Sequence, residues 1–161
     1  MKTAFKSIVA ISIFMISFVG FGQELEEAVI YQINNPSIKQ LQLPAAQTEN
    51  SSIFIVQVGT DNLIETSANS PNVELALNQN GSNNVIRMID SADKINVSVI
   101  QNGNQNTLTK YNFFSNTLVN STFIQNGNNQ DINVFGENSI SETMKITMTG
   151  DGQSLIVRNF N

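Results

Sequence analysis

The chain has 161 residues, a formal net charge of −5, and neither cysteine nor histidine. These absences exclude zinc sites of the usual ligand types, cysteine nucleophiles and histidine general bases. We therefore expect no metal and no cofactor, and any catalysis would depend on carboxylates alone. The acidic balance also argues against nucleic acid as a partner, because binding it requires clustered positive charge.

The first 22 residues predict a secretory signal peptide, residues 1–22. Two lysines precede an apolar stretch over residues 8–21, and the small residues Gly20 and Gly22 come just before Gln23. The apolar stretch is shorter than the ~20 residues that a membrane-spanning helix needs, so we expect a leader that is removed rather than a span. The protein is thus expected to be secreted and extracellular, without a disulfide framework.

Residues 23–50 predict only half of a degenerate repeat unit. Residues 28–32 alternate as in a strand, but Asn34 stands where later units have a turn glycine. Pro36 and Pro44 are expected to interrupt any following strand, because proline cannot donate to a sheet ladder. The first complete unit is therefore expected to begin near residue 51.

A hexad of pattern Gln-x-Gly-x-x-Asn then returns at a nearly fixed interval. Its sound copies begin at Gln57, Gln79 and Gln101, and a fourth copy, at Gln125, ends in Gln130 instead of asparagine. The glycines are 22, 22 and 24 residues apart, and one more follows 25 residues later. Such a period indicates stacked structural units, since one short unit cannot bury its apolar face alone. The expected turn glycines are Gly59, Gly81, Gly103, Gly127 and Gly152.

Alternating apolar residues on both sides of each hexad predict two strands per unit. Ile53 and Ile55 precede Gln57, and Ile64 follows Asn62, all with the same parity, so these amides share the inward face of the strands. Glycine suits the turn between the strands because it tolerates positive φ. We expect an all-β fold: a β-solenoid of about five strand-turn-strand rungs with two parallel sheets. The expected rungs are about 51–72, 73–94, 95–118, 119–143 and 144–161.

The inward amides predict hydrogen-bonded ladders. An unpaired buried amide costs roughly 1–3 kcal/mol, whereas equivalent amides stacked one rung apart, at ~4.8 Å, pair with one another. A slip of one residue would leave every amide unpaired, so the ladders would fix the register. One expected ladder comprises Gln57, Gln79, Gln101 and Gln125, and the other comprises Asn62, Asn84, Asn106 and Gln130.

The outward positions are partly apolar. Phe54, Val56, Ile100 and Ile124 are expected to face outward, either as a stripe for lateral contact or as ordinary scattered surface residues. Glu65 and Arg87 fall at equivalent outward places on adjacent rungs and are expected to pair.

Two positions depart from the pattern. Lys110 has inward parity, which predicts that the second strand of its rung ends early or bulges. The fifth unit, aligned on Gly152, has Gly150 and Leu155 where glutamine and asparagine are expected. It is therefore interpreted as a capping rung.

Over roughly residues 51–157 these repeats resemble the curlin repeat, the unit of secreted subunits that assemble into curli amyloid fibres. The resemblance implies export through an outer-membrane pore with accessory factors, followed by folding as an amyloid-like solenoid in a cell-surface fibre. Such fibres support adhesion and the biofilm matrix, and the implied partners are the chain itself and other curlin-type subunits. By position, residues 23–50 correspond to the segment that addresses such chains for export.

The second strand of each unit departs from the curlin pattern. Curlin repeats carry a further glutamine six residues after the asparagine of the hexad. This difference favours a minor or nucleating subunit over a major one. The residues at that place here are Ala68, Asp90, Asn112 and Gly136.

Two other functions remain open from the residues alone. A β-helix enzyme acting on polysaccharide would need two convergent carboxylates. A monomeric solenoid that binds ice or carbohydrate would need a flat ladder of one residue type, but Thr107 and Thr109 are not repeated in neighbouring rungs. The candidate carboxylates are Glu65, Asp90, Glu137 and Glu142.

Overall fold

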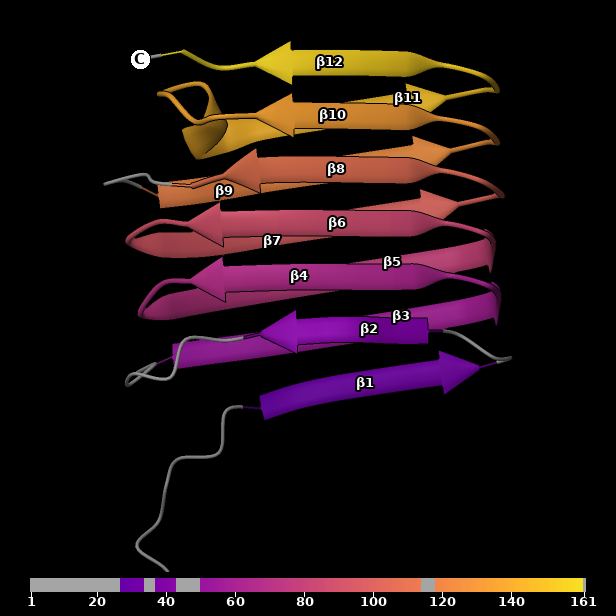
Figure 1. Ribbon diagram of the computed structural model, residues 1–161, viewed down its shortest axis with the longest axis horizontal. Coiled ribbons are helices and arrows are strands. Elements are labelled where there is room, and N and C mark those ends of the chain that lie inside the picture. The colour runs from indigo at the N-terminus through magenta and orange to yellow at the C-terminus, as the bar shows by residue number, and fades with distance from the viewer. Residues whose placement is uncertain (1–26, 34–36, 43–49, 114–117, 161) are drawn as a thin grey trace, which may run out of the picture.

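The computed structural model describes residues 27–33, 37–42, 50–113 and 118–160. In this part of the chain, strands alternate between two six-stranded sheets, and every neighbouring pair is parallel (Figure 1). The predicted fold class, an all-β solenoid with two parallel sheets, is confirmed. Among the described residues, no helix is long and apolar enough to cross a membrane.

The first sheet holds the odd-numbered strands and the second sheet holds the even-numbered ones. A short 3-10 helix, Ser141–Thr143, lies between the last two rungs. The first sheet contains β1 (Glu27–Ile33), β3 (Asn50–Thr60), β5 (Asn72–Ser82), β7 (Lys94–Asn102), β9 (Leu118–Asn126) and β11 (Met144–Thr149). The second sheet contains β2 (Ser37–Gln42), β4 (Leu63–Asn69), β6 (Val85–Ser91), β8 (Thr107–Asn112), β10 (Asp131–Phe135) and β12 (Ser154–Arg158).

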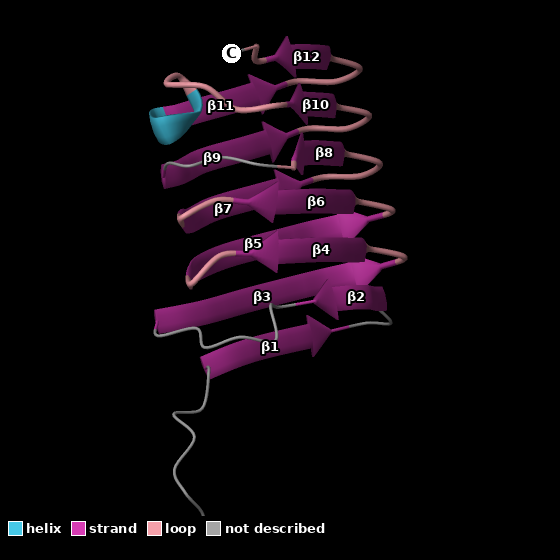
Figure 2. Ribbon diagram, turned by 60° about the vertical axis from the view of Figure 1, so that its left-hand side comes forward, coloured by secondary structure: helices cyan, strands magenta, loops and turns pink. Residues whose placement is uncertain are grey.

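The two sheets, which Figure 2 shows as two stacks of strands, enclose one narrow core of buried side chains. Buried and more exposed residues alternate along the strands from β4 to β10, as the period of two requires; β7, for example, buries every second residue from Ile95 to Gln101. The core is aliphatic, with Phe123 as its one fully buried aromatic side chain among the described residues. Apolar burial on this inward face is what holds the sheets together.

The register places equivalent residues directly above one another. Gln57 pairs with Gln79, which pairs with Gln101, which pairs with Gln125. On the second sheet, Ile64, Ile86 and Leu108 follow the same rule. One rung therefore corresponds to one hexad repeat of the sequence.

The prediction of only half a rung before residue 50 is wrong. The chain forms β1, which pairs with β3, and also β2, which pairs with β4 with a register irregularity between Ile38 and Gln40. β2 begins after Pro36 and ends before Pro44, so neither proline falls within a strand whose ladder it would interrupt. The signal peptide predicted for residues 1–22 lies outside the described residues.

The alignment of the fifth unit on Gly152 is also wrong, by two residues. Met148 pairs with Gln125, and the Gly150 N–H donates to Asn126, as the Gly127 N–H does to Asn102. Gly150 therefore holds the place of the hexad glycine, and Leu155 pairs with Ile132 rather than replacing an asparagine. Gly150 and Gly152 lie close together, so the sequence allows two alignments. The hydrogen bonds between rungs select the alignment on Gly150.

Lys110 does not end or bulge its strand. β8 continues to Asn112, and Lys110 is in register with Met88 on one side and Val134 on the other. Its side chain is fully buried. The prediction fails because the ammonium group finds carboxylate partners inside the core, as described below.

Candidate functional site

The hexad turns depend on glycine for two reasons. Gly103 has φ 118°, in the region that L-residues disfavour, and a Cβ atom there would lie 1.9 Å from the carbonyl oxygen of Gly127 in the next rung. A second positive φ follows two residues later, at Gln105 with φ 58°. The turn is therefore shaped by the neighbouring rung as well as by its own backbone. The predicted turn residue Gly152, with φ 66°, holds this second place rather than the first.

The glutamine ladder runs through the core as a continuous chain of hydrogen bonds. The Nε2 of Gln57 donates to the Oε1 of Gln79 over 2.7 Å, and the next two steps, through Gln101 to Gln125, are both 2.8 Å. The second hydrogen of the Gln101 amide reaches the carbonyl oxygen of Val85 at 3.0 Å. These four glutamines are fully buried, and the ladder gives each amide a hydrogen-bond partner, although the Oε1 of Gln57, at the start of the ladder, has none among the described residues.

The second column works differently from the predicted side-chain ladder. The Oδ1 of Asn84 accepts from the backbone N–H of Asn106 at 3.1 Å, while its Nδ2 donates to the carbonyl oxygen of Gly103 at 2.8 Å. Direct pairing of side chains occurs between Asn84 and Asn62, at 3.1 Å. Gln130 continues the column, because its backbone N–H donates to Asn106. This column therefore clamps each turn to the next one.

At the C-terminal end of the solenoid, an inward apolar position is more exposed than its equivalents in the rungs beneath it. Leu155 occupies the inward place of Ile132 and Leu108, which are fully buried, yet it is 37% exposed. Ile156 and Phe160 are 57% and 79% exposed. Among the described strands none pairs beyond β11 or β12, so this end is an open edge of both sheets.

The outward apolar residues fall into rows along the sheets. Val56, Ile100 and Ile124 lie in one row of the first sheet, interrupted by Asn78, and Phe54, 44% exposed, lies in an adjacent row. The structure thus places the predicted stripe on the outward face of the first sheet.

The second sheet carries an aromatic group that the sequence analysis missed. The Tyr111 ring centroid lies 6.2 Å from that of Phe113 and 6.1 Å from that of Phe135. The signal was present, because Tyr111 and Phe135 have outward parity in equivalent strands.

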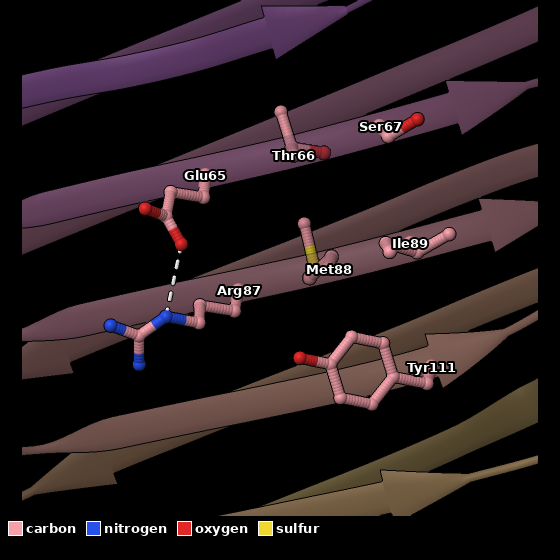
Figure 3. A pocket seen from close by; sticks show the side chains of 7 residues that line it. All are labelled: Glu65, Thr66, Ser67, Arg87, Met88, Ile89 and Tyr111. Carbon is pink, nitrogen blue, oxygen red and sulfur yellow. Dashed lines mark hydrogen bonds and ion pairs between the residues drawn. The ribbon is translucent and has the colours of Figure 1, made fainter.

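A shallow depression lies beside this aromatic group, on the outward face of β4, β6 and β8 (Figure 3). The Arg87 Nε donates to the Glu65 Oε2 over 2.9 Å across it, which confirms the predicted pair. The other lining residues, among them Thr66, Met88 and Tyr111, bring no second carboxylate to Glu65. The depression does not have the paired acids that glycoside hydrolysis requires.

A charged cluster lies inside the solenoid, on its second sheet. The Lys110 Nζ donates to the Asp90 Oδ1 and to the Glu137 Oε1, and all three side chains are almost wholly buried. The three residues come from three successive rungs, on β6, on β8 and just after β10. Two of the four carboxylates named as enzyme candidates thus meet, but around a buried lysine and not in an open groove.

Electrostatics sets this cluster apart from the surface pair. Burial raises the pKa of Asp90; the adjacent Lys110 ammonium opposes this effect and the Glu137 carboxylate adds to it. The Glu137 Oε2 is buried and makes no hydrogen bond to the described part of the chain. Taking ions out of water costs several kcal/mol each, so three charges in one core are expensive to keep.

Comparison of the chain with protein-family models, with curated proteins and with solved structures finds no match.

Proposed function

We propose that the chain is a structural subunit of a curli-like amyloid fibre at the cell surface, supporting adhesion and a biofilm matrix. It assembles by stacking the sheet edges of successive subunits. Support comes from the curlin-like hexads, which lie in register in the core, and from the open ends of both sheets.

The open C-terminal end is the observation that carries the proposal. An unpaired strand edge is a template for another strand unless something blocks it. Here the edge formed by β11 and β12 also carries apolar side chains, led by Leu155, that another rung would cover. In an isolated molecule this exposure has a cost, and in a stack it is removed.

The direction of the strands specifies how subunits join. All strands of a sheet are parallel, so β1 and β2 of one copy continue the two sheets when they stack on β11 and β12 of another. Such a contact joins two different surfaces of the same chain. A head-to-tail contact that does not close on itself generates a filament.

The partners follow from the same proposal. They are further copies of the chain, other curlin-type subunits, an outer-membrane export pore and its accessory factors. The missing second glutamine, for example Ala68 and Asp90 in place of it, favours a minor or nucleating subunit.

Fibre diffraction tests the proposal. The mature chain, from Gln23 onward, is refolded, incubated and examined for amyloid-dye binding. We expect a meridional reflection near 4.7 Å. A monomer that stays soluble in sedimentation experiments and does not bind the dye contradicts the proposal. A nucleating subunit should also accelerate assembly of a partner curlin at low molar ratio, whereas a major subunit should need stoichiometric amounts.

A further inference from the structure

Lys110 is held in an environment that an ordinary lysine avoids. It is among the largest fully buried side chains, and its neighbours in register, Met88 and Val134, are apolar. Its amine contacts two carboxyl groups and is shielded from water. The Arg87–Glu65 pair forms at the surface, so ion pairing alone does not explain why the Lys110 cluster is buried.

The pairing of β6 with β8 fixes the positions of the Asp90 carboxyl group and the Lys110 amine. Asp90 lies two residues after Met88 on the same inward face of β6, and Lys110 stands beside Met88, so the lysine side chain extends along the core to reach the carboxyl group. Groups held in contact by a rigid scaffold react far faster than the same groups free in solution, because the entropy of bringing them together has already been lost.

We propose that Lys110 and Asp90 condense into an intramolecular isopeptide bond that joins the lysine Nζ to the aspartate Cγ, with Glu137 as the proton carrier. The bond links β6 to β8, and so connects two successive rungs covalently.

The reaction needs no oxidant and no activating group. The Glu137 carboxylate takes one proton from the Lys110 ammonium, and the neutral amine attacks the Cγ of protonated Asp90, forming the C–N bond. Glu137 passes its proton to the leaving hydroxyl and takes the second proton from nitrogen. The C–O bond breaks and water leaves with its electron pair. The products are an amide, one water molecule and a protonated Glu137, so the protons and the charge balance.

The division of roles between the two acids follows from their surroundings. A carboxylate anion resists nucleophilic attack, whereas burial raises the pKa of Asp90 and so favours its neutral acid. Glu137 contacts the same amine through Oε1 and keeps Oε2 without a hydrogen bond to the described residues, so it has an oxygen available for the proton. Condensation also removes the two buried charges, on Lys110 and Glu137, that remain when Asp90 is protonated, which favours the product.

Mass spectrometry of the refolded full chain, denatured only for measurement, tests the bond. We expect an intact mass lower than the sequence mass by one water molecule. Trypsin should cut after Lys94 and Lys145 but not after Lys110, and residues 88–94 should remain attached to residues 95–145 as a branched peptide. A full intact mass with normal cleavage after Lys110 overturns the proposal, and so does loss of water with Lys110 still cleavable.

Matched variants separate the roles. Lys110→Arg keeps a cation but should retain the full mass, and Glu65→Gln, which removes the exposed pair, should leave the bond intact. Asp90→Asn should form the same bond with loss of ammonia instead of water. Glu137→Gln should slow bond formation at least tenfold during refolding, and an unchanged rate overturns its role. These masses are measured on monomer before assembly, so failure of the fibre proposal does not affect the result.

Discussion

Gln101 sits in the middle of the glutamine ladder and has a buried amide partner above and below. It accepts from Gln79 at 2.8 Å and donates to Gln125 at 2.8 Å. An amide buried in this way contributes little if all its bonds are made, yet costs much if one is lost. The ladder thus favours one register over its neighbours more than it adds to stability.

Replacing Gln101 with leucine should therefore be costly although the two side chains are similar in size. The change leaves the Gln125 Oε1 unpaired and removes the acceptor of Gln79, so the free energy of unfolding should fall by roughly 2–5 kcal/mol. Urea denaturation of the monomer measures it. Ser98→Ala on the outward face of the same strand is the control, expected within about 0.5 kcal/mol. Equal effects at both sites would show that the ladder is dispensable.

The turn glycines give a second prediction at the residue scale. Gly103→Ala should destabilise the chain by more than about 3 kcal/mol, since it adds the strain of positive φ to a collision with the Gly127 carbonyl oxygen. Gly152→Ala has positive φ but no atom within 4 Å of the new Cβ, so its cost should be only about 1–2 kcal/mol. Thermal unfolding of both variants compares them, and a smaller loss at Gly103 would contradict the role of the neighbouring rung.

At the scale of elements, β12 differs from the interior strands of its sheet because one of its edges is open. Its sequence follows the same inward parity, with Leu155 and Val157 in register with Ile132 and Val134. What changes is the absence of a covering strand among the described residues. The strand is thus built like an interior strand and placed at an end.

A charge at this edge should block the proposed growth of a fibre without unfolding the monomer. Leu155→Lys is expected to slow elongation from preformed seeds at least tenfold, because an edge lysine opposes strand addition. The monomer should lose only about 1 kcal/mol, since Leu155 is already partly exposed. Ile140→Lys, in the loop before the 3-10 helix and 65% exposed, is the control and should elongate normally. Equal elongation rates for the two variants would place the growth surface elsewhere.

At the scale of the whole molecule, the proposed head-to-tail stacking of subunits predicts the geometry of a fibre. Each sheet has six strands, so a subunit in a head-to-tail stack occupies six layers. At ~4.8 Å per layer, the helical rise per subunit should be about 29 Å. Helical reconstruction from electron micrographs measures it. A rise of about 4.8 Å would instead mean that every subunit adds a single flat layer, and would contradict the solenoid stack.

The sequence predicted the fold well because its signals are local and repeated. Parity and the hexads place Gln57 inward and Gly59 in a turn without any long-range information. Lys110 was misinterpreted because its partners, Asp90 and Glu137, lie in other rungs and meet it only after stacking. The fifth unit was misaligned because Gly150 and Gly152 both fit a turn that needs two positive φ angles. Contacts between rungs, in short, depend on the register that the fold itself creates.

The two connections of a rung, the hexad turn and the connection on the opposite side, differ in how much their length varies. The hexad turn keeps the same hydrogen bonds in rung after rung, whereas the opposite connection ranges from residues 70–71 between β4 and β5 to residues 136–143 between β10 and β11. The strands stay in register despite this difference. That side of the solenoid is therefore where peptides or tags can be inserted for display, and in a fibre they would be arrayed at one fixed interval along its length.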